Sequence, residues 1–287
     1  MKGKKLKFVL AAALATAAVT VYGQDCCSEG CAENGSQIGD RSGAKIAIAA
    51  HRGFWDCDGA GRMENTIAAL REAQTAGLWG SEFDVHLTAD GQIVVHHDRH
   101  IQGVDIQTSE LAPLRGFTLK NGEKMPTLDE YLDQGGKSSG TILVLEFKAQ
   151  YDEARENALV DLALQKIKDH GLYDPARIMF ISFSLNVCRR VAELAPEFTN
   201  QYLNGDIAPS ELKEMGINGI DYHFNVLEKH PDWVSQAHEL GMSVNAWTVN
   251  KAADIQKMID LGVDCITTND PLLVRELLGE RELKLVE

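Results

Sequence analysis

The 287-residue sequence predicts a single α/β domain folded as a (β/α)8 barrel, the TIM-barrel architecture. From residue 45 onward, apolar runs typical of strands alternate about eight times with segments of helical periodicity. The strand-like runs are apolar throughout, as expected for a parallel sheet that is buried on both faces. The alternative is a doubly wound open sheet, but this would usually have fewer strands and a glycine-rich nucleotide loop after the first strand. The sequence shows neither a smaller number of strands nor such a loop.

The predicted barrel begins with a strand at residues 45–50 and a helix at 64–76, which ends before Gly77. The second strand is expected at residues 81–87. A turn at 88–91 and a further apolar run at 93–96 predict a short β-hairpin extension of this strand. The irregular stretch that follows is too short for a large extra subdomain.

The rest of the domain is predicted as a short helix followed by six strand–helix pairs. Several of the helices end in a glycine just before the next strand, as at Gly241 and Gly262, which is a typical helix stop. The predicted helix is 128–133, and the pairs are 142–147 with 153–168, 178–183 with 186–194, 199–203 with 210–215, 219–222 with 233–240, 243–247 with 252–261, and 265–267 with 271–278.

The first 23 residues have the pattern of a signal peptide. Four lysines between residues 2 and 7 precede an uninterrupted small, apolar run at 8–21, and small residues suited to cleavage end at Gly23. The alternative is an uncleaved anchor helix, but the run is shorter than the ~20 residues that span a bilayer. We therefore expect export to the periplasm or the medium, without stable membrane insertion after cleavage.

Residues 24–44 are rich in Cys, Gly, Ser and Asn and are expected to form a flexible leader before the barrel at 45–280; residues 281–287 are expected to form a C-terminal tail. Cys26, Cys27 and Cys31 lie in the leader and lack the spacing and the fourth ligand of a metal site. Cys188 and Cys265 lie in apolar segments and are expected to be buried thiols. The pairing of the cysteines stays open.

The charge balance is acidic. Lys plus Arg number 28 against 42 for Asp plus Glu, a net charge of -14, and loss of the four signal-peptide lysines would make it 24 against 42, or -18. A nucleic-acid partner is not expected, because phosphate backbones are bound by clustered cations. An anionic small molecule would need cations placed locally at its site.

Carboxylates gather at the ends of two predicted strands, where the active sites of such barrels lie. Glu82 and Asp84 are two residues apart and project from one face of their strand, and Glu146 lies near the end of the next barrel strand. A set of oxygen ligands without thiolates suits Mg²⁺ or Ca²⁺ better than Zn²⁺. The alternative is that the acids form salt bridges with Arg52 and Lys148.

Two histidines follow predicted strands, His51 after the first strand and either His96 or His97 after the hairpin. A histidine pair can supply a general base and a general acid near neutral pH. The residues alone do not show which of His96 and His97 faces the site. The others are expected to be structural, namely His86, His100, His170, His223, His230 and His238.

In eight ordered segments the chain resembles the glycerophosphodiester phosphodiesterases over about residues 45–278. The matching segments are His51-Arg52-Gly53, Glu64-Asn65-Thr66, Glu82-x-Asp84-Val85 with Thr88-x-Asp90-Gly91, His97-Asp98, Pro126-Thr127-Leu128, Glu146-x-Lys148, Ala246-Trp247-Thr248-Val249-Asn250 and Thr268-Asn269-Asp270-Pro271. The segment after His97-Asp98 departs from the family pattern.

The resemblance implies a metal-dependent hydrolase that releases sn-glycerol 3-phosphate and an alcohol from small-molecule glycerophosphodiesters. It implies one divalent cation, Mg²⁺ or Ca²⁺, and a set of residue roles. These roles are metal ligation by Glu82, Asp84 and Glu146, acid/base catalysis by His51 and His97, phosphate contact by Arg52 and Lys148, lining of the substrate pocket by Trp247, and support of Arg52 or of the metal ligands by Glu64.

Several alternatives stay open. The same site could serve a lyase that forms a cyclic phosphate, a phospholipase D-like enzyme, or a barrel that only binds phosphodiesters. Asn65 and Thr66 could belong to the site or cap the first helix. The loop at residues 54–63 could cover the site through Trp55 or be a solvated, glycine-rich loop. The alcohol head group and the oligomeric state are not indicated by the sequence.

Overall fold

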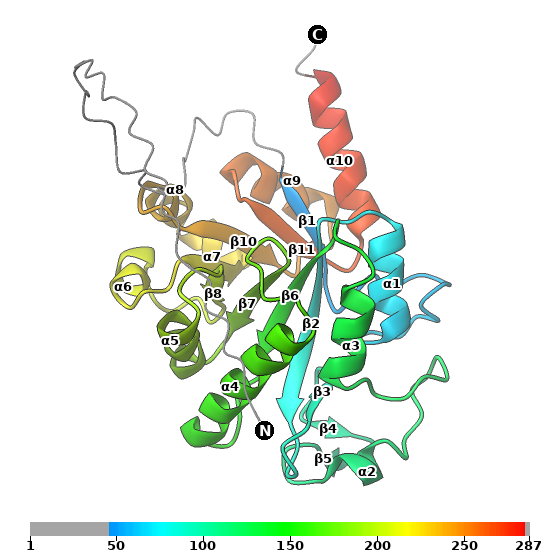
Figure 1. Ribbon diagram of the computed structural model, residues 1–287. Coiled ribbons are helices and arrows are strands. Elements are labelled where there is room, and N and C mark those ends of the chain that lie inside the picture. Colours follow the sequence, from blue (N-terminus) through cyan, green and yellow to red (C-terminus); the bar gives the residue numbers. More distant parts are fainter. Residues whose placement is uncertain (1–45, 285–287) are drawn as a thin grey trace, which may run out of the picture. The chain divides into compact units, whose positions relative to one another are not determined.

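Eight parallel strands close into a barrel in the computed structural model, which describes residues 46–284 (Figure 1). The ring is closed by β1, which pairs with β11 on one side and with the start of β2 on the other. The end of β2 pairs instead with the antiparallel β3, so the predicted hairpin extension is confirmed. The barrel strands are β1 (Ala47–Ala50), β2 (Gly80–Leu87), β6 (Ile142–Phe147), β7 (Ile178–Ser182), β8 (Asn200–Tyr202), β9 (Gly219–His223), β10 (Ser243–Trp247) and β11 (Cys265–Thr268).

Helices surround the barrel and connect its strands (Figure 1). Three shorter strands and a one-turn helix lie beyond the carboxyl end of β2. The short strands are β3 (Ile93–Val95), β4 (His100–Ile101) and β5 (Val104–Asp105). The helices are α1 (Ile67–Thr75), α2 (Leu111–Leu114), α3 (Leu128–Gly135), α4 (Glu153–Asp169), α5 (Leu185–Leu194), α6 (Pro209–Glu214), α7 (Phe224–Lys229), α8 (Asp232–Glu239), α9 (Ala252–Leu261) and α10 (Pro271–Lys284).

Successive side chains on each strand point alternately outward, to the core beneath the helices, and inward, to the barrel interior. In β2, Phe83 and Val85 pack outward in one apolar cluster with Leu145 of β6 and the buried face of α4. Glu82 and Asp84 therefore project from the opposite face of β2, toward the barrel axis. The register places Asp84 directly beside Glu146, so the strand pairing itself brings two of the predicted metal ligands together.

Local sequence signals set the ends of the helices. The Thr66 hydroxyl accepts a hydrogen bond from the Ala69 amide at the start of α1, so Thr66 is the N-cap. Gly262 follows the last residue of α9 and has a φ of 77°, a left-handed conformation that favours glycine. The prediction that this glycine ends the helix is therefore confirmed.

Some elements differ from the expectation. The stretch after β3 contains β4, β5 and α2, which enclose a small apolar cluster around Val94 and Met125. Helix α7 was not predicted, and α10 runs to Lys284 rather than ending at 278. Trp55 packs with Ala68 and Ala69 at the start of α1, so the 54–63 loop is anchored there by its tryptophan.

The predicted signal peptide at 1–23 and the leader with Cys26, Cys27 and Cys31 lie outside the described residues. Within 46–284, Cys57, Cys188 and Cys265 are free thiols, and the last two are buried, as expected. None of the helices between residues 46 and 284 is both long and apolar enough to cross a membrane.

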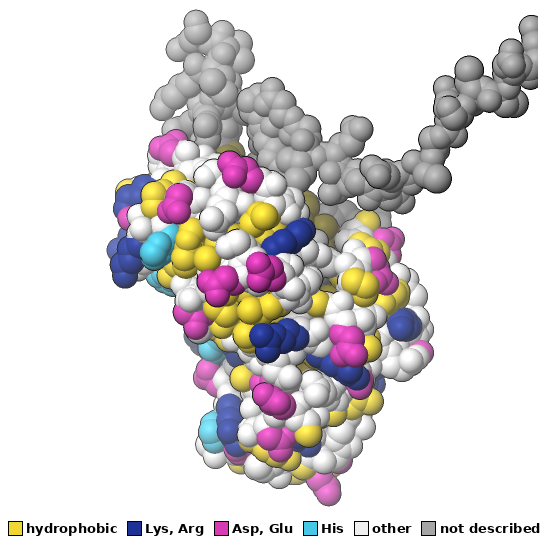
Figure 2. All heavy atoms as spheres, turned by 90° about the vertical axis from the view of Figure 1, so that its left-hand side faces the viewer, with side chains coloured by type: hydrophobic (Ala, Val, Ile, Leu, Met, Phe, Trp, Pro, Cys, Tyr) yellow, Lys and Arg dark blue, Asp and Glu magenta, His cyan; other side chains and the backbone are white. Residues whose placement is uncertain are grey.

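The surface on the side of α5, α6 and α8 carries both signs of charge (Figure 2). On this face, lysine and arginine side chains alternate with acidic and apolar ones and form no continuous basic stripe. A cationic environment for a phosphate on this protein must therefore be sought in a local site rather than on this face.

Candidate active site

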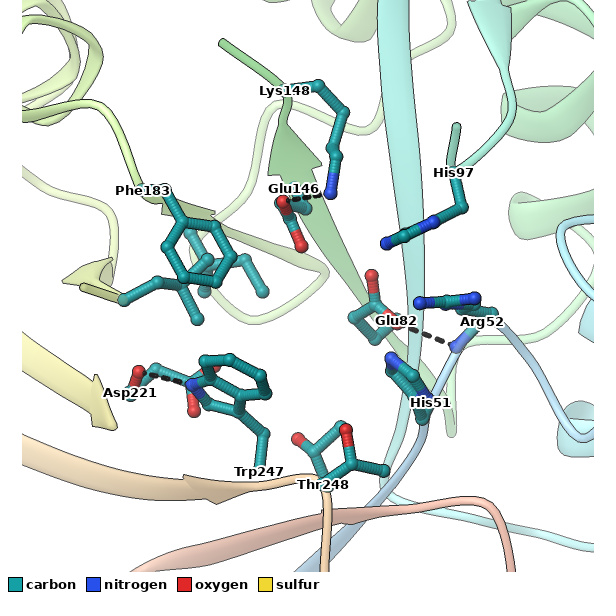
Figure 3. A pocket seen from close by; sticks show the side chains of 13 residues that line it. His51, Arg52, Glu82, His97, Glu146, Lys148, Phe183, Asp221, Trp247 and Thr248 are labelled. Carbon is teal, nitrogen blue, oxygen red and sulfur yellow. Dashed lines mark hydrogen bonds and ion pairs between the residues drawn. The ribbon is translucent and has the colours of Figure 1, made fainter. Parts of the chain in front are cut away.

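A pocket of about 120 Å³ opens at the carboxyl ends of the barrel strands. In Figure 3, His51, Arg52 and His97 lie on one side of it, Phe183, Trp247 and Asp221 lie on the other, and Glu82 and Glu146 lie between them. Its lining residues are His51, Arg52, Glu82, His97, Glu146, Lys148, Ile181, Phe183, Leu203, Asp221, Trp247, Thr248 and Thr267.

Glu82, Asp84 and Glu146 form a buried acidic cluster beside this pocket. Each contributes a carboxylate oxygen to a group whose atoms all lie within 4.8 Å of one another. Their side chains come from the neighbouring strands β2 and β6, and the three residues are 2%, 1% and 7% exposed. The structure thus brings together the three acids that were predicted to bind a metal.

The three carboxylates cannot all carry charge in this environment without a compensating cation. Burial, together with the charges of Asp84 and Glu146, raises the pKa of Glu82 well above its usual range. Burial and Asp84 likewise raise the pKa of Glu146 to about 8. Burial also opposes ionisation of Asp84, but Lys148, His97 and a hydrogen bond from Asn65 outweigh it and lower its pKa.

Lys148 supplies part of the compensation. Its ammonium lies 2.7 Å from Glu146 Oε1 and 3.3 Å from Asp84 Oδ1. Burial disfavours the charged ammonium, but the charges of Glu146 and Asp84 raise the pKa of Lys148 to about 12. Lys148 therefore stays cationic at the edge of the pocket.

The donor set fits a divalent cation with oxygen ligands. Glu82 Oε2 accepts the Arg52 backbone N–H at 2.6 Å, whereas Glu82 Oε1 is buried without a hydrogen-bond partner in residues 46–284. An unpartnered buried carboxylate oxygen beside two further carboxylates is costly unless a cation binds there. The cluster offers oxygen atoms and no thiolate or imidazole, as Mg²⁺ and Ca²⁺ prefer.

Arg52 is held by several neighbours in a tight turn after β1. Arg52 and Gly53 have φ values of 57° and 81°, which turns the Arg52 N–H toward Glu82. The guanidinium donates to both carboxylate oxygens of Glu64, at 2.9 and 3.0 Å.

Asn65 donates to Asp84 Oδ2 at 2.8 Å and accepts from the Asp84 N–H at 3.1 Å. Asn65 therefore orients the acidic cluster, while its neighbour Thr66 caps α1.

His51 lines the pocket next to Arg52. Its Nδ1 lies 2.8 Å from Asn269 Oδ1, and an Nδ1–H donated to this oxygen leaves Nε2 with a free lone pair. Burial and the charge of Arg52 lower the pKa of His51 to about 4, against the opposing effect of the Asn269 hydrogen bond. The ring is therefore neutral near pH 7.

His97, rather than His96, lines the pocket. Its Nδ1 lies 2.8 Å from Asp98 Oδ1, and this hydrogen bond lowers the pKa of Asp98. The buried His86 lies with its Nε2 3.2 Å from the carbonyl oxygen of His97 and fixes the backbone there. The imidazole of His97 is thus oriented from its Nδ1 side.

Residues 51–273 match the glycerophosphoryl diester phosphodiesterase family. The chain belongs to this family. It is therefore an enzyme, a glycerophosphodiester phosphodiesterase, and a barrel that only binds phosphodiesters is no longer an alternative.

Individual relatives agree with the family assignment. The chain is 29% identical over 246 residues to the glycerophosphodiester phosphodiesterase of Caldanaerobacter subterraneus subsp. tengcongensis, covering 79% of this chain and 95% of the relative. It is 41% identical to a crystallised glycerophosphodiester phosphodiesterase of Parabacteroides distasonis, with a TM-score of 0.80 and coverage of 83% and 98%. An Oleispira antarctica phosphodiesterase solved with the product sn-glycerol-3-phosphate shares the fold, at 24% identity and a TM-score of 0.70 over 81% and 96% of the chains.

The wall of the pocket facing the histidines is aromatic in this glycerophosphodiester phosphodiesterase. Trp247 donates its indole N–H to the Asp221 carbonyl oxygen at 2.8 Å. The rings of Phe183 and His223 meet the Trp247 ring edge-on, at centroid distances of 5.3 and 5.2 Å. Trp247 therefore lines the pocket as predicted, and Phe183 adds a second ring.

The structure places the nine predicted site residues in one region. All of them line the pocket except Asp84, which lies behind it in the acidic cluster, and Glu64, which holds Arg52. Their functional roles stay predictions. Sequence reasoning assigned no role to Phe183, Asp221 or Asn269. Phe183 and Asn269 directly follow β7 and β11, and Asp221 lies two residues before the end of β9, so all three are near the strand ends where such barrels place functional groups.

Proposed function

We propose that this enzyme hydrolyses glycerophosphodiesters to sn-glycerol 3-phosphate and an alcohol, using one divalent cation and the pair His51 and His97. The observation that carries the proposal is the convergence of three buried carboxylates, two imidazoles and two cationic side chains on one pocket. Glu82, Asp84 and Glu146 would hold Mg²⁺ or Ca²⁺, which when bound would neutralise charge on the phosphodiester and activate an attacking hydroxyl or water.

Arg52 and Lys148 would bind the phosphate oxygens. Both side chains line the pocket, and each is already held by carboxylates, Arg52 by Glu64 and Lys148 by Glu146. Donors that are fixed before the substrate arrives need no reorganisation as negative charge grows on the phosphoryl oxygens. They also supply the local cations that an acidic protein needs in order to bind an anion.

His51 would act as the general base and His97 as the general acid. The Asn269 contact leaves His51 Nε2 free to take the proton of the nucleophile as its oxygen attacks phosphorus. As the bond from phosphorus to the alcohol oxygen breaks, a proton from His97 would pass to that oxygen, while Asp98 holds the other side of the ring. Acid/base assistance of this type typically contributes ~10²–10⁴ to the rate.

The test is the turnover of glycerophosphocholine by His51→Ala, His97→Ala and the control His230→Ala, whose imidazole stacks on Trp233 away from the pocket. We expect both site variants to lose ~10²-fold or more in kcat and the control to match the parent enzyme. Phosphorus NMR should show sn-glycerol 3-phosphate. Full activity of both site variants would refute the assignment, and a cyclic phosphate as the final product would instead support a lyase.

We also propose that the enzyme works outside the cytoplasm, in the periplasm or the medium. The support is the sequence of residues 1–23, with its lysines, apolar run and small residues. Expression of the full chain, fractionation and N-terminal sequencing would test this proposal. We expect a mature chain that begins after Gly23, whereas an intact chain in the cytoplasm would contradict it.

A further inference from the structure

We propose that Asp221, together with Thr267, forms the subsite for the terminal hydroxyl of the substrate's glycerol moiety. This inference rests on the function proposed above and assigns a role to a buried acid that the acid/base chemistry does not use. Asp221 would bind the substrate without taking part in the reaction itself.

The first observation is that one carboxyl oxygen of the buried Asp221 has no hydrogen-bond partner among residues 46–284. Asp221 is 1% exposed, and its Oδ1 has no hydrogen-bond partner within residues 46–284. Its neighbour on β10 is Asn245, whose amide group also donates to Thr267 Oγ1 at 3.0 Å and accepts from the Ala246 N–H. A buried carboxyl group with one unpartnered oxygen is suited to gain a hydrogen bond from a ligand.

The second observation is the location of Asp221 in the barrel. It stands on β9, and three strands separate β9 from β2 in either direction around the closed ring. Asp221 therefore lies across the barrel axis from Glu82, and Figure 3 shows it with Trp247 on the wall away from His51 and Arg52. A phosphate bound beside Arg52 and Lys148 would direct the far end of a three-carbon chain toward Asp221.

The third observation is the chemistry of that wall. Its apolar lining residues, Ile181, Leu203, Phe183 and Trp247, offer contacts for carbon atoms. Asp221 and Thr267 offer polar atoms between them, from β9 and from β11. The combination matches glycerol, which has an apolar edge and hydroxyl groups. The larger alcohol would leave through the pocket mouth, where Phe183 is 37% exposed.

The protonation of Asp221 agrees with this role. Burial raises the pKa of Asp221 to about 8, although Asn245 opposes the shift through its side-chain hydrogen bond. The carboxyl group is therefore mainly neutral near pH 7, so it does not repel the phosphodiester. A neutral carboxyl group can also both donate to a hydroxyl and accept from it.

The experiment compares two substrates, glycerophosphocholine and the phosphocholine diester of propane-1,2-diol, which keeps the middle hydroxyl and lacks the terminal one. The parent enzyme, Asp221→Ala and Asp221→Asn would be assayed on both. The matched control is Gln201→Ala, because Gln201 is 2% exposed, also has an unpartnered Oε1, and is not among the lining residues of the pocket. Thermal unfolding would confirm that each variant is folded.

We expect the parent enzyme to prefer the glycerol diester by ~10-fold or more in kcat/KM, because unpaired polar groups at a site discriminate against an analogue that lacks the hydroxyl. Asp221→Ala should lower kcat/KM for the glycerol diester by ~10-fold, mainly by raising KM. The same variant should change kcat/KM for the propanediol diester by less than ~2-fold. Asp221→Asn should keep most of the preference for the glycerol diester, and Gln201→Ala should leave this preference unchanged.

If folded Asp221→Ala loses kcat/KM equally for both substrates, the inference is overturned. If that variant does not fold, a parent enzyme that turns over both diesters equally well would overturn it as well. The proposed function is tested separately, because hydrolysis of neither diester by the parent enzyme with Mg²⁺ or Ca²⁺ would count against that function and not against the subsite.

Discussion

The ammonium of Lys148 lies 2.7 Å from Glu146 Oε1. This contact places a permanent cation at the edge of the cluster that is proposed to bind a divalent metal. Under the proposed function Lys148 would serve two opposing purposes, because it would attract the phosphate of the substrate and compete with the metal for carboxylate charge.

Lys148→Met should separate these two effects. Loss of the ammonium removes a phosphate donor, so we expect kcat/KM to fall by ~10²–10³. Loss of the competing positive charge should at the same time tighten the binding of Mg²⁺ or Ca²⁺, measured by isothermal titration. Lys213→Met, a change on the exposed side of α6, is the control. Weaker metal binding in Lys148→Met would contradict this account.

Removal of divalent ions with EDTA should abolish phosphodiesterase activity and lower the unfolding temperature. Ion binding to the folded state alone adds ~2.7 kcal/mol to the free energy of unfolding at 100 times the dissociation constant. Adding Mg²⁺ or Ca²⁺ back should restore both properties in the parent enzyme and in Glu211→Gln, which changes an exposed acid on α6. Glu82→Gln should show neither recovery, and a metal-induced stabilisation of that variant would place the ion elsewhere.

Asn269→Ala tests the orientation of His51. Without the acceptor at 2.8 Å, the ring can turn and either nitrogen can carry the proton. We expect kcat to fall by ~10-fold or more. The Asn269 hydrogen bond also opposes the lowering of the His51 pKa, so its loss should move the acid limb of the kcat/KM profile to lower pH. An unchanged profile would show that Asn269 acts only on structure.

Asp221 should make stability depend on pH. Because burial raises the pKa of its carboxyl from 3.8 to about 8 in the folded protein, folding favours the protonated form. The stabilisation is complete below pH 3.8 and is lost as the pH rises toward 8. Asp221→Asn should therefore gain stability relative to the parent enzyme between pH 4 and 8, measured by urea unfolding. Parallel curves for the two proteins would argue against a buried neutral acid.

Thr66→Ala tests the start of α1, the helix that follows the Arg52 turn. The hydroxyl accepts from the Ala69 N–H at 3.1 Å and donates to the Met63 carbonyl oxygen at 2.9 Å. Loss of such an N-cap costs ~1 kcal/mol of unfolding free energy. Thr108→Ala, at an exposed position, should cost much less. Equal unfolding midpoints for these two variants would refute the capping role.

The barrel could be predicted from sequence because its signals are local. Apolar runs, helical periodicity and the terminal glycines of the helices each lie within a few residues of the element that they define. The predicted strand at 142–147 and helix at 252–261 have the observed bounds. The strands β4 and β5 have only two residues each, which is too short for a periodic pattern. Helix α7 begins at Phe224, and its N-cap is His223, a residue type that is not a usual N-cap.

The acidic cluster could also be predicted, because Glu82 and Asp84 share a face of one strand and Glu146 lies near the end of the next barrel strand. The supporting contacts could not. Asn269 reaches His51 across 218 positions, through the pairing of β11 with β1 that closes the ring. The lack of a partner for Asp221 Oδ1 among residues 46–284 is likewise a result of packing, because no sequence pattern shows which polar atoms are left unpaired.

The two walls of the pocket come from different stretches of the chain. The proposed metal ligands, the proposed acid/base pair and the two cations belong to residues 51–148, whereas the aromatic wall with Asp221 and Thr267 belongs to residues 181–267. Under the proposed roles, mutations in the later stretch would diversify which esters are accepted during evolution, while the metal ligands and the two histidines stay unchanged.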